Sequence, residues 1–205
     1  MRPTRRLWQL LAVVFVLSFA ALGWIGREIY LAAPPIPATV ATTTGEVLFT
    51  GADIRRGQQA WLSAGGQQLG SVWGHGSYVA PDWSADWLHR EALELRELQS
   101  RRLFGESYSK LTLEQRGRIE ARLRTEMRSN GFDPDTDMLV VSAERATAIR
   151  STAAHYAGLF GAEPALDVLR EQYAMTADTL PESADRSALT AFFFWTSWSA
   201  STDRP

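Results

Sequence analysis

Histidines, cysteines and paired carboxylates carry much of the chemistry of proteins, and this chain of 205 residues has few of them. It has no cysteine, which excludes disulfides, thiolate metal sites, covalently attached c-type haem and cysteine nucleophiles. Its three histidines, His75, His89 and His155, are too few and too widely spaced for a histidine-rich metal centre. We expect His89 on an exposed helix face and His155 in a structural position. His75 is therefore the best candidate for contact with a ligand.

His75 lies in a stretch of unusual composition, GSVWGHGSYVAPDW, at residues 70–83. The stretch is too rich in glycine for a helix and too short for a linker, so it predicts a loop of fixed backbone shape. It is no phosphate loop, because the Gly-Lys-Ser/Thr ending is missing. It is no hydrolase elbow either, because the Gly-x-Ser-x-Gly pattern is missing. No pair of carboxylates stands out, so we expect no catalytic residue in this chain.

The overall composition limits the class of protein and its partners. A net charge of -2, from 21 basic and 23 acidic residues, argues against a nucleic-acid partner, which requires a basic face. The hydrophobic fraction of 45% is sufficient for a packed core.

An uncharged, apolar run at residues 7–26 predicts a membrane anchor in contact with lipid. About 20 helical residues cross a hydrocarbon core of roughly 30 Å. A cleaved signal peptide is the alternative, although its apolar region is usually shorter, about 7–15 residues. Arg2, Arg5 and Arg6 precede the run, which predicts a cytoplasmic N-terminus and places the rest of the chain on the far side. We assign residues 1–32 to this tip and anchor.

The remaining chain predicts a spacer followed by an all-α domain. Residues 33–48 contain three prolines and no apolar periodicity, so we interpret them as an extended tether. The domain is expected at residues 49–186, with strand-like fragments limited to EVLF near Glu46 and MLVV near Met138. Helix signals follow one another along it: an N-cap at Thr50, Pro81 in a first turn, a Gly105 stop, a Thr112/Gln115 capping box, and an N-cap at Ser142.

The C-terminal segment, residues 187–205, becomes strongly apolar in the run AFFFW and ends soon afterwards. About 11 apolar residues are too few to span a bilayer. If this run were exposed to solvent, it would form a hydrophobic patch on the surface. We favour its interpretation as the start of a second transmembrane helix. The alternative is that it docks onto the core of its own domain.

Two motifs, GSVWGHGSYVAPDWSADWLHRE and AFFFWTSW-AST-RP, resemble the N-terminal region of the quinol-dependent nitric oxide reductases of the haem–copper oxidase superfamily. The resemblance covers nearly the whole chain. It implies a periplasmic domain of cytochrome c fold, attached ahead of a catalytic membrane bundle in the bacterial inner membrane. That bundle would carry the b-type haems, the non-haem iron and the quinol pocket, so quinol would be a partner through the bundle alone.

The resemblance also shows where this sequence departs from related cytochrome c subunits. Their Cys-x-x-Cys-His motif would place its cysteines at Gly66 and Leu69 and its ligating histidine at Gly70. None of the three residues is present, which implies a haem-free domain and electron transfer that bypasses it.

By the same resemblance, Gly76 through its carbonyl and Tyr78 through its hydroxyl match ligands of a calcium site whose other ligands would come from the bundle. A loop kept only as a docking surface is the alternative. The resemblance and the apolar rings imply an interface that includes Trp73, His75, Trp83 and Trp87.

These observations predict a structural N-terminal segment of a nitric oxide reductase, inactive alone. One alternative is an independent membrane-anchored periplasmic sensor or assembly module, which predicts that AFFFW packs inside the domain. If the chain is a segment of the reductase, the AFFFW run and the loop at residues 70–83 should instead bind to other surfaces when the chain is isolated. A second alternative, a haem carrier using His75 or His155 non-covalently, predicts a Soret band with added haem, and the missing motif argues against it.

Overall fold

The computed structural model describes residues 3–203 and divides into two units, one up to Pro35 and one from Ile36 onward. Arg2, Arg204 and Pro205, which entered the sequence-based expectations, lie outside the described residues.

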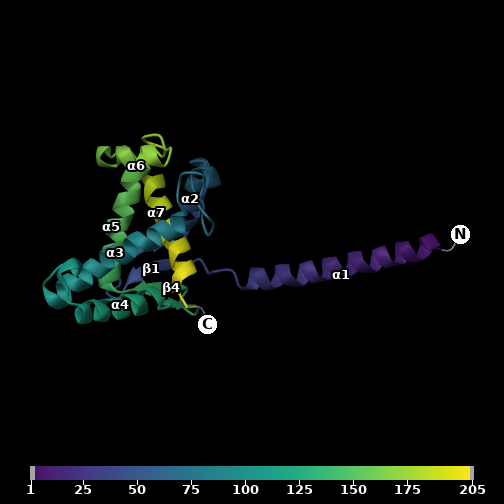
Figure 1. Cartoon of the computed structure of the whole chain (residues 1–205), viewed down its shortest axis with the longest axis horizontal. Coiled ribbons are helices and arrows are strands. Elements are labelled where there is room, and N and C mark those ends of the chain that lie inside the picture. Colours follow the sequence, from purple (N-terminus) through teal and green to yellow (C-terminus); the bar gives the residue numbers. More distant parts are fainter. Residues whose placement is uncertain (1–2, 204–205) are drawn as a thin grey trace. The chain divides into compact units, whose positions relative to one another are not determined.

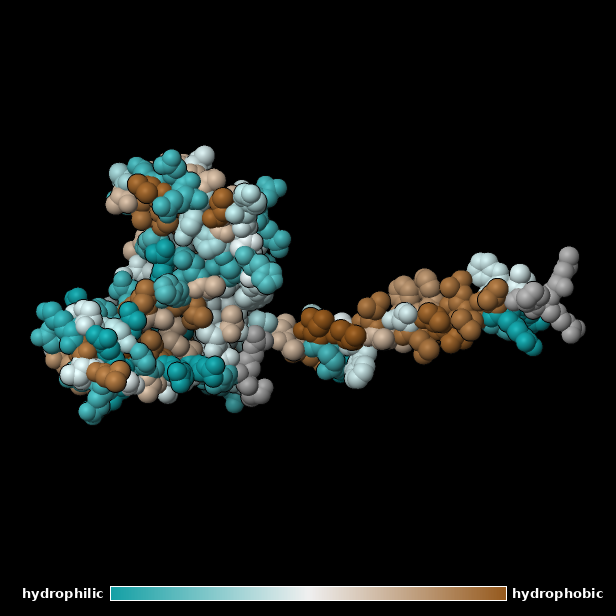
Figure 2. Space-filling model, in the orientation of Figure 1, coloured by the Kyte–Doolittle hydropathy of each residue, from teal (hydrophilic) through white to brown (hydrophobic). Residues whose placement is uncertain are grey.

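The first unit is a single long helix, α1 (Pro3–Leu31). Among the described residues it is the one helix long and apolar enough to cross a membrane, with a mean hydropathy of 2.1 over its apolar window. Its side chains are exposed from Thr4 onward, and Figure 2 shows hydrophobic residues along its length. The helix therefore fits the expected membrane anchor.

The second unit is mostly helical (Figure 1). Its α-helices are α2 (Gly51–Ser63), α3 (Trp83–Phe104), α4 (Leu113–Arg128), α5 (Ala143–Leu159), α6 (Asp167–Gln172) and α7 (Ser183–Ser201). Short 3-10 turns are η1 (Gly66–Leu69), η2 (Tyr108–Lys110) and η3 (Pro164–Leu166).

The helix starts that the sequence indicates are confirmed at three caps. Thr50 caps α2, Thr112 and Gln115 form the capping box of α4, and Ser142 caps α5. Each hydroxyl accepts a hydrogen bond from a backbone N–H of the first turn, which would otherwise have no partner. Helix α3 differs slightly, because Asp82 is its cap and Pro81 lies before the helix. Gly105 ends α3 in the left-handed conformation, as predicted.

A small sheet corrects the all-α prediction. Its strands are β1 (Thr39–Thr42), β2 (Val47–Thr50), β3 (Phe132–Asp133) and β4 (Met138–Val141), in the order β2-β1-β4-β3. Strands β1 and β4 are parallel, and the other two pairs are antiparallel.

The tether predicted at residues 33–48 is wrong from Ile36 onward, since that part of the chain contains β1 and the start of β2. Val40 and Ala41 are buried there. A strand of four residues is too short to show a period, and its partner β4 lies far away in the sequence. Of the two pairings that order this segment, the one with β2 is local and the one with β4 is therefore tertiary.

The second transmembrane helix predicted from residue 187 is also corrected. Residues 188–199 of α7 are all buried within the folded unit. Figure 1 shows α7 in yellow, running beside α2, α3 and α5, and these three helices make its most extensive contacts. The alternative interpretation, in which the AFFFW run docks onto its own domain, is the one that the structure has.

Helix α2 approaches α7 most closely at Gly57. A Cβ atom built on Gly57 would lie 2.6 Å from the Ala188 carbonyl carbon and 2.7 Å from the Phe192 Cβ. A helix interior normally disfavours glycine. Here the missing side chain is what allows the two backbones to meet.

Gly57→Ala is therefore expected to lower the free energy of unfolding by at least about 2 kcal/mol, because the helices must separate to admit the methyl group. The expected fall in Tm is roughly 4–8 °C, measured by circular dichroism on the full chain in detergent. Gly117→Ala in α4 is the matched control, since no atom lies within 4 Å of its built Cβ. It should leave Tm unchanged or raise it slightly. Equal Tm values for the two variants would contradict the close approach.

Candidate functional site

The glycine- and tryptophan-rich loop, residues 70–82, is closed at its base by a polar clamp. Asp82 Oδ2 accepts hydrogen bonds from the Gly74 N–H at 2.5 Å and the Ser71 hydroxyl at 2.8 Å. The Ser71 Oγ in turn accepts one from the Gly76 N–H at 2.8 Å. Backbone bonds join the two ends, from Ser71 N–H to Pro81 O and from Trp83 N–H to Ser71 O. The fixed shape predicted for this loop thus has a physical basis.

Besides Gly70 at its start, two residues of the loop have a positive φ, Gly76 and Trp73. Gly76 has a φ of 83°, and a Cβ there would lie 2.9 Å from Ala80 O. Trp73 has a φ of 53°, which is uncommon for a bulky residue. Its ring compensates by packing 5.3 Å from that of Trp195, and its Nε1–H donates to Thr196 O at 2.8 Å. The loop is therefore pinned to α7 through Trp73.

The tip of the loop faces solvent. His75 is exposed, Tyr78 is fully exposed, and Val79 is 48% exposed. An apolar and aromatic tip on a rigid base is a surface suited to docking.

Trp83 and Trp87 do not belong to that surface, and the interface predicted for them is wrong. Both are 0% exposed. Trp83 stacks on Phe193 with ring centroids 5.6 Å apart, and Trp87 stacks on Tyr156 at 5.2 Å. They begin α3 and face the interior, so their four-residue spacing marks a core face and not a contact surface.

The positions that match a haem-attachment motif do not fit a haem. Gly66 and Leu69 delimit the turn η1, and Gly70 follows with a φ of 114°. A Cβ on Gly70 would lie 2.6 Å from Trp83 Cε2 and closer still to Nε1, which donates to Leu69 O. A histidine at position 70 would thus be both strained and blocked by the Trp83 ring.

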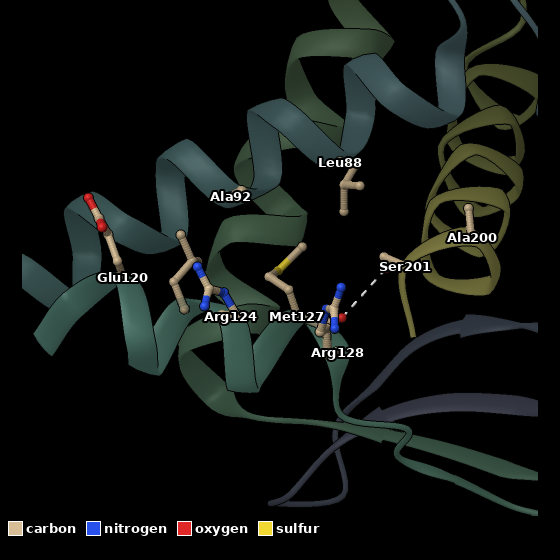
Figure 3. Close-up of a pocket in the computed structure, with 9 residues that line it drawn as sticks. Leu88, Ala92, Glu120, Arg124, Met127, Arg128, Ala200 and Ser201 are labelled. Atoms are coloured by element: carbon tan, nitrogen blue, oxygen red, sulfur yellow. Dashed lines mark hydrogen bonds between the residues drawn. The ribbon is translucent and has the colours of Figure 1, made fainter. Parts of the chain in front are cut away.

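A groove of about 500 Å³ lies at a different place, between α3, α4 and the end of α7 (Figure 3). Its walls are mostly apolar, and arginines lie at its rim. It is lined by Leu88, Ala92, Glu120, Leu123, Arg124, Met127, Arg128, Ala200 and Ser201.

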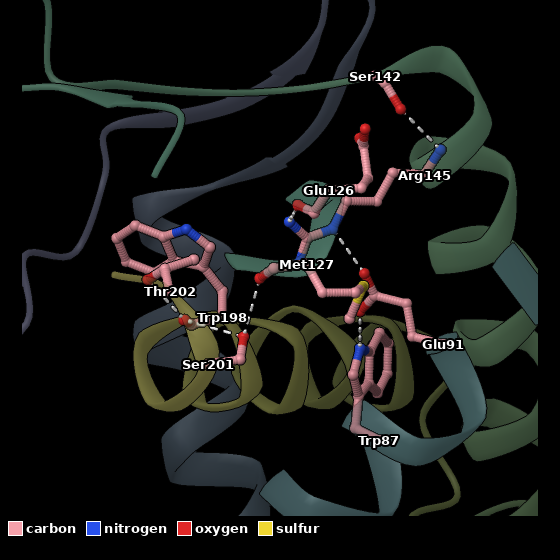
Figure 4. A network of polar contacts seen from close by, with 9 residues as sticks. All are labelled: Trp87, Glu91, Glu126, Met127, Ser142, Arg145, Trp198, Ser201 and Thr202. Atoms are coloured by element: carbon pink, nitrogen blue, oxygen red, sulfur yellow. Dashed lines mark hydrogen bonds and ion pairs between the residues drawn. The ribbon is translucent and has the colours of Figure 1, made fainter. Parts of the chain in front are cut away.

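Next to this groove is a buried ion pair that the sequence did not reveal (Figure 4). Glu91 Oε1 accepts from Arg145 Nε at 2.7 Å, and Glu91 Oε2 accepts from Trp87 Nε1–H at 2.8 Å. Arg145 also donates to the Glu126 carbonyl. Both charged side chains are nearly inaccessible, 4% and 0% exposed. The pair fixes α5 against α3 and the end of α4, whereas HRE in the sequence suggested only an exposed helix face.

A second polar cluster surrounds His155. Tyr156 donates its hydroxyl hydrogen to Asp86 at 2.5 Å, and Arg90 pairs with the same carboxylate at 2.9 Å. Burial raises the pKa of Tyr156 and of Tyr173. Burial, aided by the positive charge of Arg90, lowers the pKa of His155 to about 4. His155 is therefore neutral at physiological pH, in agreement with a structural position.

No metal centre is assembled among residues 3–203, since no group of three or more His, Asp or Glu residues could hold an ion there. Gly76 and Tyr78 contribute two neutral oxygens at most. The calcium site therefore stays a prediction that needs ligands from a partner.

A protein-family model that describes the cytochrome c-like domain of NorB, a nitric oxide reductase component, matches residues 37–205. The chain belongs to this family. The region that the family model matches includes the whole of helix α7 and also strand β1. The inclusion of β1 agrees with its being a folded strand of the domain and not part of a tether. A comparison with curated proteins found no relative similar enough to match.

Asp82→Ala should loosen the loop of the cytochrome c-like domain, because Gly74 and Ser71 lose their shared acceptor. Hydrogen bonds to a charged group are worth about 1.5–3 kcal/mol, so the Gly74 amide should exchange at least about tenfold faster. Hydrogen–deuterium exchange of the full chain measures this. Ser77→Ala removes a weaker bond to Ala80 N–H and should leave Gly74 unchanged. Unaltered exchange at Gly74 in the Asp82 variant would refute the clamp.

His155 should make the domain less stable as the pH falls. Its pKa is lower in the folded state than in the unfolded chain, so the unfolded state binds more protons below about pH 6.5. Because the imidazole is partly solvated, we expect a loss of about 1 kcal/mol between pH 7 and 5. Chemical denaturation at the two pH values tests this. His155→Gln should remove most of the loss, whereas His89→Gln, on the exposed face, should retain it.

Proposed function

We propose that this chain is the membrane-anchored N-terminal part of a quinol-dependent nitric oxide reductase, with a structural and haem-free cytochrome c-like domain. The parent reaction converts two NO and a quinol into N₂O, water and quinone. Membership of the NorB cytochrome c-like family carries the proposal. The quinol donor and the structural role extend beyond that membership.

The haem-free state is supported by the residues themselves. The chain has no cysteine for thioether attachment. Trp83 occupies the space that a side chain at Gly70 would need. The interior beyond it is filled by aromatic rings within 5.4–6.0 Å of Trp83, namely Tyr156, Phe160, Tyr173 and Phe193. A domain without its own redox group passes no electrons, so the donor would reach the membrane bundle directly.

The docking role is supported by the loop. Its base is rigid and pinned to α7, while Tyr78 and Val79 at its tip have no partner surface in the folded unit. We propose that this tip packs against the catalytic bundle. A calcium ion shared by Gly76 O, Tyr78 Oη and bundle ligands is one form that the contact would take.

The location that we propose rests on α1. Arg5 and Arg6 lie in the first turn of α1, ahead of its apolar run, which supports insertion in the bacterial inner membrane with a cytoplasmic N-terminus and a periplasmic domain.

The competing proposal is an independent sensor or assembly module. This alternative predicts that the AFFFW run packs inside the domain. Residues 188–199, which include the run, are indeed buried. That burial no longer separates the two proposals, because the family model itself extends over the whole of α7. The reductase proposal keeps first place on the family match.

Tyr78→Ala, introduced into the gene of the cell that makes the protein, should lower quinol-driven NO consumption by the membranes of that cell by about 30-fold. A buried aromatic contact of this kind is worth roughly 2 kcal/mol, and its loss weakens docking on the bundle. Tyr78→Phe separates the two forms of the contact, because it retains the ring and removes the hydroxyl ligand.

Leu113→Ala is the control, since Leu113 is equally exposed but lies on α4, away from the loop. NO consumption that depends on a reduced cytochrome and not on quinol would overturn the donor assignment. Unchanged consumption after deletion of residues 36–205 would instead favour the sensor or assembly module.

A further inference from the structure

Two arginines at the end of α4 lack the partners that surround most other charges of the domain. Arg124 and Arg128 are exposed and one helical turn apart. Among residues 3–203, neither guanidinium forms an ion pair or hydrogen bond. Like charges four residues apart on a helix repel each other. The negative end of the helix dipole favours basic residues there.

The first hollow is the apolar groove of about 500 Å³. Figure 3 shows Leu88 and Met127 pointing into the space between α3, α4 and α7, with Arg128 at its edge. Ala92 and Ala200, with their small side chains, leave the space open.

The second hollow is lined by residues with polar or charged side chains, and it shares both arginines with the first. It measures about 430 Å³ and is lined by Arg124, Thr125, Arg128, Ser129, Asn130 and Asp203. Arg124 and Arg128 thus lie between an apolar compartment and a hydrogen-bonding one. This arrangement matches a molecule with an apolar chain and an anionic polar head.

The chain connection supports a membrane lipid as the source of that molecule. Ile36 follows Leu31, the last residue of the apolar helix α1, by five residues, so at most about 18 Å of chain separates them. Ala38 then bonds to Asp137 O, in the β3–β4 hairpin that follows α4. The chain therefore joins the folded unit at the hairpin that directly follows α4, the helix that carries both arginines.

We propose that this groove binds an anionic phospholipid, with an acyl chain between α3, α4 and α7 and its phosphate at Arg124 and Arg128. The occupant would fix the domain at the bilayer surface independently of the loop at residues 70–82. The inference rests on the proposed membrane anchorage of α1.

The test uses the full chain in liposomes with a trace of phosphatidylglycerol that carries a photoactivatable group in its acyl chain. Mass spectrometry of the digested protein gives the ratio of cross-links at residues 88–92 and 123–128 to those on α1. We expect clear labelling of the groove, and much weaker labelling with a phosphatidylcholine probe. The double variant Arg124→Gln/Arg128→Gln should lower the ratio about 25-fold, because each basic side chain contributes about fivefold at an anionic surface.

Matched variants distinguish recognition of the lipid head group from recognition of its acyl chain. Ala92→Trp fills the groove and should abolish its labelling with the arginines intact. Ala121→Trp on the exposed face of α4 and Arg101→Gln/Arg118→Gln should leave the ratio unchanged.

Three results would overturn the inference. The groove could remain unlabelled while α1 is labelled, as expected if a protein partner fills it. The double arginine variant could leave the ratio unchanged. Glycerol phosphate could displace the label, which would indicate a site for free phosphate. Absence of label on α1 would instead refute the membrane anchorage of this helix. Failure of the groove proposal and failure of the proposed anchorage are therefore distinguishable.

Discussion

Helix α7 carries the aromatic run of the chain, and so large an apolar surface must be enclosed. Residues 188–199 are buried throughout, and the positions of α2, α3 and α5 follow from that requirement. Gly57 allows α2 to come into backbone contact, while Trp83 and Trp87 turn the start of α3 inward. The same packing fills the interior with aromatic rings. Enclosure of α7 therefore determines both the fold and the lack of room for a ligating side chain at Gly70.

The loop at residues 70–82 depends on this core in two ways. Asp82 caps α3 and also gathers the loop amides, so the loop is oriented by the helix that it precedes. Trp73 donates to the backbone of α7 itself. The buried Glu91–Arg145 pair then links α3 to α5. These contacts hold the base of the loop in one shape, which supports the structural role proposed for this cytochrome c-like domain.

The helix starts were predictable because capping is local: Thr50, Thr112 and Ser142 act on amides within three residues. The rigid loop was predictable from its glycines. Burial of Trp83 and Trp87 could not be predicted, because an apolar pair on one helix face packs equally well against a partner protein or against the chain's own core. Strand β1 was missed because its partner β4 is distant in sequence. The Glu91–Arg145 pair joins two helices, and neither sequence segment shows that its charge is buried.

The sequence by itself determined the apolar helix α1, the caps and ends of the main helices, the absence of cysteine chemistry and the family resemblance. These depend on composition or on neighbours within a few residues. The tertiary structure alone decided that the aromatic run of α7 is a core helix, since a bilayer and a protein interior select the same apolar residues. It also brought Arg124 and Arg128 between an apolar hollow and one lined by polar or charged side chains. Such a site consists of side chains from three helices, and their meeting is a property of packing and not of any one segment.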